Sequence, residues 1–320
     1  MHSKKNNFHF APCDDNRVNH LTYHRNGEKR VGEQILLNNA GDATFVILGI
    51  NENVGPLANH GKAGSEHAFE NAIKYFLNTQ VHSGFEAKNC AVLGHIQQFH
   101  WEKDVEKCED LVEELDDFVF EVLNNHVLPH QVPIVIGGGH NNALPLMHWA
   151  AKHHTLSIVN IDPHADCRAF PPRHSGNSFS IALTEKTIRD YAVFGLHEAY
   201  NNTFIREFLA KFNCRHTFYE DYLENRKKFL DDVHSYMNEI DENNHIGFEI
   251  DLDAIANMPS SAMSPSGWTV DEIRLLIRTL PQKKRISYLH FPEGAPDSDR
   301  ENTFAGKAIA YFLRDFLTLG

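Results

Sequence analysis

Apolar runs of strand length alternate with helix-like segments along most of this chain. The runs with the character of buried parallel strands lie at 44–50, 89–93, 132–136, 156–161, 191–196, 215–219, 245–252 and 286–291. Helical spacing of apolar residues is clearest at 65–77, 103–124, 142–152, 201–212, 221–240, 270–278 and 303–317. This alternation predicts an α/β protein with three layers, helices on both faces of a mostly parallel sheet of about eight strands.

The domain organisation follows from the continuity of this pattern. No internal repeat, low-complexity tract or linker interrupts it, which predicts one α/β catalytic domain over residues 41–320. Residues 1–40 are polar and rich in asparagine and histidine, and we expect them to form a peripheral N-terminal segment.

Composition excludes several classes of protein. A formal charge of −13 argues against nucleic acid or an anionic membrane as the main partner. No run of about 18 apolar residues could span a bilayer, and the polar N-terminus lacks the apolar core of a signal peptide. The five cysteines are scattered without CxxC spacing, as expected for reduced thiols in a cytoplasmic protein.

Chemically reactive side chains gather where predicted strands end. Asp162, His164 and Asp166 occupy alternate positions after the run at 156–161, and Asp251 and Asp253 close the run at 245–252. On an extended backbone, alternate residues face the same side. Two further strands contribute one side chain each, His140 after a glycine turn and Glu293 after the run at 286–291. Ligands of open α/β sheets bind at this edge.

The candidate metal ligands are two imidazoles and four carboxylates: His140, Asp162, His164, Asp166, Asp251 and Asp253. Clustered carboxylates at a buried strand end are costly unless cations neutralise them. An oxygen-rich set without thiolate suits Mn²⁺ better than structural zinc, and six groups suit two octahedral ions that share carboxylates. Cys167, beside Asp166, is the one cysteine close enough to be an alternative ligand.

These motifs resemble the signatures of the ureohydrolase family, which includes arginases, agmatinases and formimidoylglutamases. In family order they are the glycine turn ending at His140, the Asp-x-His-x-Asp motif at 162–166 and the Asp-x-Asp motif at 251–253. The segment 48–64 resembles the family's first strand and its Asn-x-Gly-Arg-x-Gly loop. The resemblance covers residues 44–317 and implies an arginase-like fold with two Mn²⁺ ions per subunit.

The resemblance also implies roles for the ligands. Asp162 and Asp251 would bridge both manganese ions, and the remaining ligands would complete one ion each. Asp166 would also orient a bridging hydroxide that attacks the trigonal carbon of an amidine or guanidine. Glu293 matches the position that pairs with the cationic nitrogens of the substrate, although a solvated loop glutamate is the alternative.

Several details resemble the formimidoylglutamase branch of the family. The glycine turn has Gly139 where arginases carry aspartate, and the loop at 175–179 resembles that branch's Ser-Gly-Thr-Pro-Phe. Arg168 could bind a substrate carboxylate, or could pair with a neighbouring acidic side chain. The predicted substrate-binding residues are therefore Arg168, Ser175 and Asn177. His174 stands next to the family's proton-shuttle position, which Ser175 occupies, so its catalytic role is left open.

The chain departs from the family pattern at Pro163 and after Asp253, where the usual Asp-Pro is missing. These changes leave the ligands intact and leave the choice of substrate open. The leading hypothesis is a binuclear manganese hydrolase of linear amidines, with N-formimidoyl-L-glutamate as substrate. The alternatives are a guanidine hydrolase and a family member that binds metal without turnover. The expected partner is a small, carboxylated amidine or guanidine, and assembly into a homo-oligomer stays open.

Overall fold

One mixed sheet of ten strands forms the centre of the molecule in the computed structural model, which describes residues 7–37, 41–281 and 283–318. The strands are β1 (Phe8–Pro12), β2 (Leu36–Leu37), β3 (Phe45–Asn51), β4 (Cys90–Gln98), β5 (Val132–Ile136), β6 (Leu156–Ile161), β7 (Asp190–Leu196), β8 (Arg215–Phe218), β9 (His245–Ile250) and β10 (Ile286–Phe291). Their order is β1-β4-β3-β5-β10-β9-β6-β7-β8, with β2 beside β4. Only β1 is antiparallel to its neighbour among these strands.

The predicted α/β class is confirmed, with ten strands where the sequence predicted about eight. The eight predicted strands all form, and several end within one or two residues of their predicted limits. The two additional strands, β1 and β2, lie within the segment that we expected to be peripheral, and both pair with β4. Every residue of β3, β6 and β10 is buried, as expected for parallel strands covered on both faces.

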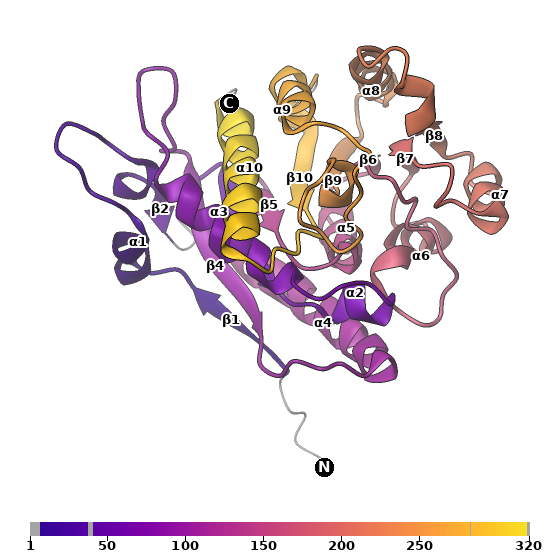
Figure 1. Ribbon diagram of the computed structural model, residues 1–320, viewed down its shortest axis with the longest axis horizontal. Coiled ribbons are helices and arrows are strands. Elements are labelled where there is room, and N and C mark those ends of the chain that lie inside the picture. The colour runs from indigo at the N-terminus through magenta and orange to yellow at the C-terminus, as the bar shows by residue number, and fades with distance from the viewer. Residues whose placement is uncertain (1–6, 38–40, 282, 319–320) are drawn as a thin grey trace.

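Helices cover both faces of the sheet (Figure 1). One layer contains α3 (Ala68–Leu77), α8 (Lys228–Glu239), α9 (Val270–Thr279) and α10 (Asp299–Leu317), whose apolar residues belong to one core cluster. The other contains α4 (Val105–His126), α5 (Ala143–Ala151), α6 (Ser178–Glu185) and α7 (Thr203–Lys211), which pack into a second cluster. Two short helices, α1 (Asp15–Leu21) and α2 (Val54–Ala58), complete the described fold.

Helix limits differ most from the prediction in two places. The helix predicted from residue 221 begins only at Lys228, because the Asp221 carboxylate accepts a hydrogen bond from the Phe218 backbone N–H and stabilises a turn of 3₁₀ helix instead. The loop predicted around 175–179 leads directly into α6, which begins at Ser178. Serine favours turns and helix ends, so this composition did not predict a helix.

The carboxyl ends of β5, β10, β9 and β6 lie side by side, because these four strands are consecutive in the sheet. The segments that follow them carry all the predicted metal ligands and Glu293. Sheet topology therefore brings together residues that are up to 153 positions apart in the sequence. Among the described helices, none is long and apolar enough to cross a membrane.

Candidate metal centre

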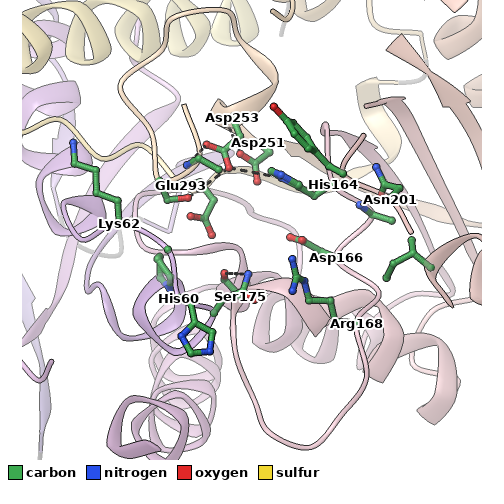
Figure 2. A pocket seen from close by; sticks show the side chains of 18 residues that line it. His60, Lys62, His164, Asp166, Arg168, Ser175, Asn201, Asp251, Asp253 and Glu293 are labelled. Carbon is green, nitrogen blue, oxygen red and sulfur yellow. Dashed lines mark hydrogen bonds and ion pairs between the residues drawn. The ribbon is translucent and has the colours of Figure 1, made fainter. Parts of the chain in front are cut away.

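A cavity of about 310 Å³ opens at this edge of the sheet. Figure 2 shows its labelled side chains converging from opposite sides, with Asp251, Asp253 and Glu293 on one side and Arg168 and Ser175 on the other. The predicted site residues that line the cavity are His164, Asp166, Arg168, Ser175, Asp251, Asp253 and Glu293. The remaining two ligands, His140 and Asp162, are fully buried against this group.

Three carboxylates surround one imidazole nitrogen at the floor of the cavity. His140 Nδ1 lies 3.2 Å from Asp162 Oδ2, 3.0 Å from Asp166 Oδ2 and 2.9 Å from Asp251 Oδ2. None of these contacts has hydrogen-bond geometry, and within the described residues the nitrogen has no hydrogen-bond partner. A buried ring nitrogen and three carboxylate oxygens that face one another in this way form a ligand set for a cation.

A second cluster shares one carboxylate with the first. His164 Nδ1 lies 3.6 Å from Asp162 Oδ1 and 3.8 Å from Asp253 Oδ2. The two oxygens of Asp162 therefore face different imidazoles, Oδ2 toward His140 and Oδ1 toward His164. This arrangement is what a carboxylate that bridges two ions requires.

The ligands converge through turns as well as through strand alternation. Asp253 lies in a turn of 3₁₀ helix, where its backbone N–H donates to Asp251 Oδ1 at 2.7 Å. The backbone N–H of His164 donates to Asp162 Oδ1 at 2.7 Å, and Asp166 adopts a positive φ of 45°. The predicted convergence is therefore correct, but the extended backbone that we used to predict it ends at Asp162 and Asp251.

The turn that presents His140 is organised by a buried carboxylate, Glu52. Its oxygens accept hydrogen bonds from the Gly139 backbone at 2.7 Å, the Gly55 backbone at 3.1 Å and the Asn142 amide at 2.8 Å. Gly138 has a φ of +69°, and a Cβ there would lie 2.7 Å from Glu52 Oε1, so this position requires glycine. Burial raises the pKa of Glu52, and the hydrogen bonds that its carboxylate accepts partly offset this rise.

The electrostatics of the site call for cations. Burial, together with the charge of Asp162, raises the pKa of Asp251 well above its ordinary value, and the pKa of Asp166 is raised by the same two causes. Burial lowers the pKa of His164, but the neighbouring carboxylates outweigh it and raise that pKa to about 10. Four carboxylates balance two divalent cations in formal charge, and their donor set with two imidazoles fits Mn²⁺.

Glu293 is buried, with only 4 % of its surface exposed, so the alternative of a solvated loop glutamate is wrong. Its Oε1 accepts a hydrogen bond from the His140 backbone N–H at 2.7 Å. Burial and the nearby Asp253 raise the pKa of Glu293 to about 8. A cationic group bound beside this carboxylate would offset both the cost of its burial and its repulsion by Asp253.

Arg168 and Ser175 lie across the cavity from Glu293 (Figure 2). Within the described part of the chain, Arg168 forms no ion pair with a carboxylate, whereas Ser175 Oγ accepts a hydrogen bond from the Asn59 amide at 3.3 Å. The guanidinium of Arg168 is therefore available to an anionic group of a ligand.

Two predicted site residues lie away from the cavity. The ring of His174 caps the turn that follows it, since Nδ1 accepts a hydrogen bond from the Gly176 backbone at 3.1 Å. Asn177 is fully buried, and its amide donates to the Pro172 carbonyl at 2.7 Å. Neither side chain lines the cavity, because each is used to hold the loop. Cys167 is also buried off the cavity, and burial keeps the pKa of its thiol well above the ordinary value.

Arg173 connects this loop to the turn that carries His140. Its Nη1 donates to Asn177 Oδ1 at 2.9 Å, and its Nη2 donates to the Asn141 carbonyl at 2.6 Å. Its Nε donates to Asp116 Oδ2 on α4 at 2.7 Å. One buried guanidinium therefore fixes the loop at 173–177 relative to the turn that carries His140.

The sequence did not single out several residues that the structure brings to the site. His60 and Lys62 line the cavity from the segment 48–64, in which the family resemblance gave them no role, and Lys62 pairs with Asp297 at 2.8 Å. Tyr200 lines it from a loop that carries no motif. Glu249 lies directly behind His140, at 3.4 Å from its Nε2. Its alternate spacing with Asp251 and Asp253 was the one sequence signal that could have identified it.

With this geometry in place, comparison with known proteins identifies the family. The sequence matches the arginase family over residues 44–318. This chain belongs to the arginase family. The resemblance drawn from the three metal motifs is therefore confirmed.

Formimidoylglutamases are among the similar proteins. The formimidoylglutamase of Staphylococcus carnosus is 25 % identical over 277 residues, which cover 85 % of each chain. The formimidoylglutamase structure from Bacillus subtilis superposes with a TM-score of 0.76 at 16 % identity, over 93 % of this chain and 94 % of that one. The Trypanosoma cruzi formiminoglutamase with Mn²⁺ gives a TM-score of 0.71 at 19 % identity, over 91 % and 99 % of the two chains. At these identities the structural likeness shows the arginase fold.

Proposed function

We propose that this arginase-family chain is a binuclear manganese hydrolase of linear amidines and that its substrate is N-formimidoyl-L-glutamate. The observation that carries the proposal is the shared Asp162 carboxylate, whose two oxygens face the imidazoles of His140 and His164. The names of the similar proteins support the substrate, since formimidoylglutamases appear among both the sequence and the structural relatives.

The proposed ligand assignment follows the two clusters. His140 and Asp166 would hold one ion, His164 and Asp253 the other, and Asp162 and Asp251 both. Two manganese ions, when bound, lower the pKa of a water molecule and polarise the substrate. Asp166, a ligand that also lines the cavity, accepts a hydrogen bond from the attacking water and orients it.

The cavity also explains how an acidic amidine would be oriented. The Glu293 carboxylate accepts hydrogen bonds from the amidine nitrogens, and the Arg168 guanidinium across the cavity binds a substrate carboxylate. Water adds to the amidine carbon, and the bond from that carbon to the substrate's α-nitrogen breaks. Formamide and glutamate are the products, and the glutamate nitrogen takes the proton released by the water.

A substrate panel tests this function. The protein is loaded with Mn²⁺ and assayed with N-formimidoyl-L-glutamate, arginine, agmatine and 4-guanidinobutyrate, while formamide and urea are measured. We expect formamide from the first compound and little urea from the others. Preference for agmatine, which has no carboxylate, would contradict the role of Arg168. Full manganese content without hydrolysis of any compound would favour a non-catalytic family member.

We also keep the cytoplasm as the proposed location. All five cysteines are buried free thiols, the state expected where thiols stay reduced.

A further inference from the structure

The second nitrogen of His140 faces away from the cavity, toward a buried carboxylate. His140 Nε2 lies 3.4 Å from Glu249 Oε2. The other three carboxylates that contact His140 make their ion-pair contacts with Nδ1, and Glu249 is completely buried. A carboxylate in the core is costly, so its presence here needs an explanation.

Neighbouring strands hold this carboxylate in place. Glu249 of β9 lies beside His290 of β10 in the sheet register. Tyr288 Oη donates to Glu249 Oε1 at 2.8 Å, and His290 Nδ1 contacts Oε2 at 2.7 Å. A Cβ at Gly247 would lie 2.6 Å from the Tyr288 ring, so glycine at that position makes room for the tyrosine. The sequence of both strands is therefore arranged around one carboxylate.

The two nitrogens of His140 then have different tasks. Nδ1 faces three carboxylate oxygens of the metal cluster, where a cation needs its lone pair. A neutral imidazole carries its proton on the other nitrogen, and Glu249 Oε2 faces that side at 3.4 Å, a contact that does not have hydrogen-bond geometry. An anionic acceptor behind a metal-binding histidine fixes the tautomer and orientation of the ring and makes the ligand more basic.

We propose that Glu249 is a positioning residue that raises the affinity of the protein for the manganese ion bound by His140. Tyr288 and His290 hold the Glu249 carboxylate in place. The inference rests on the proposed manganese centre. Loss of such a partner typically costs about 10–100-fold in metal affinity. The effect should fall mainly on one of the two ions, because the described contacts of Glu249 include His140 and not His164.

The same geometry has a rival explanation. Ligand atoms of His140, Glu249 and His290 lie within 4.8 Å of one another, close enough for a third cation. A divalent ion there would bring two positive charges into a fully buried place with one carboxylate. The 2.7 Å contact between His290 and Glu249 also makes a hydrogen bond the simpler explanation. The number of metal ions bound per chain distinguishes a positioning carboxylate from a third cation site.

Glu249→Gln is the variant that tests the proposal, because it keeps the shape of the side chain and removes its charge. Metal-free protein is titrated with Mn²⁺ by calorimetry, and ions per chain are counted by mass spectrometry. We expect two ions per wild-type chain and, in the variant, a fall of about 10–100-fold in affinity for one of them. Asp315→Asn is the matched control, since Asp315 is buried and held by Arg274 and Arg278 away from the cavity. It should leave both affinities unchanged.

A second variant, Tyr288→Phe, decides the matter if Glu249→Gln does not fold. It removes one hydrogen bond to the carboxylate and should lower the affinity for the same ion by a smaller factor. Unchanged affinities in the folded variants, an equal loss in Asp315→Asn, or three ions per wild-type chain would overturn the proposal. The titration uses no substrate, so its result stands even if the protein hydrolyses none of the amidines.

Discussion

His174 provides a quantitative test of how the loop beside the cavity is held. Burial, reinforced by the positive charges of Arg168 and Arg173, lowers the pKa of His174 from 6.5 to about 4. The folded protein therefore keeps this ring neutral at a pH where the unfolded chain already protonates it. Because the unfolded chain binds this proton more readily, lowering the pH favours unfolding. The effect of His174 on the free energy of unfolding is therefore absent above pH 6.5 and destabilises the protein progressively as the pH falls toward 4.

The size of the effect follows from the two pKa values. At pH 5.5 the linkage amounts to about 1.4 kcal/mol of lost unfolding free energy, and at pH 7.5 it is close to zero. His174→Asn removes the titrating group and keeps a side chain that can cap the turn. Between pH 7.5 and pH 5.5, wild-type protein should therefore lose about 1.4 kcal/mol more stability than the variant.

Urea unfolding of metal-free protein at both pH values measures this difference, because all other titrating groups are common to the two proteins. His20→Asn, on α1 and away from the cavity, controls for the loss of a histidine at an exposed position. Equal pH dependence in wild type and His174→Asn would refute the reasoning. At pH 8 with Mn²⁺ the variant should also keep its turnover. A selective loss of kcat would return His174 to the catalytic role that the sequence left open.

Three further predictions concern the cavity. Asp162→Asn should lose both manganese and activity, because both clusters share this carboxylate; full metal content by mass spectrometry would contradict the assignment. Glu293→Gln should keep two ions per chain yet lose most of its turnover, and retained kcat would remove this carboxylate from the mechanism. Arg168→Met should lower kcat/KM for the carboxylated amidine by about 10–100-fold, as expected for loss of a charge-assisted hydrogen bond. Formamidine, which has no carboxylate, should react equally with wild type and Arg168→Met, and an equal loss on both substrates would argue against the assigned contact.

The sequence predicted the strands of the sheet and the convergence of the candidate metal ligands well, for related physical reasons. A fully buried strand such as β6 needs an unbroken apolar run, and a polar side chain at its end is then conspicuous. Asp162 and Asp251 each occupy that place, and the parallel topology brings such ends together.

Residues that act through loop conformation could not be predicted in this way. His174 and Asn177 lie in a segment whose turns and caps use their side chains, and spacing alone does not reveal which way a loop residue points. The role of Glu249 could not be predicted for a different reason. This residue lies within a regular strand, but its carboxylate is held by partners on β10 that are about 40 residues away in the sequence. Sequence patterns report local periodicity, whereas these roles depend on long-range contacts.

The position of Arg173 has a consequence for how substrate preference can change during evolution. Its guanidinium joins the loop at 173–177, the turn after β5 and helix α4, so moving that loop would also disturb the turn that presents His140. Insertions there would weaken metal binding together with specificity. New preferences would therefore arise more readily by exchange of single side chains at the rim, such as Arg168, than by remodelling the backbone that supports them.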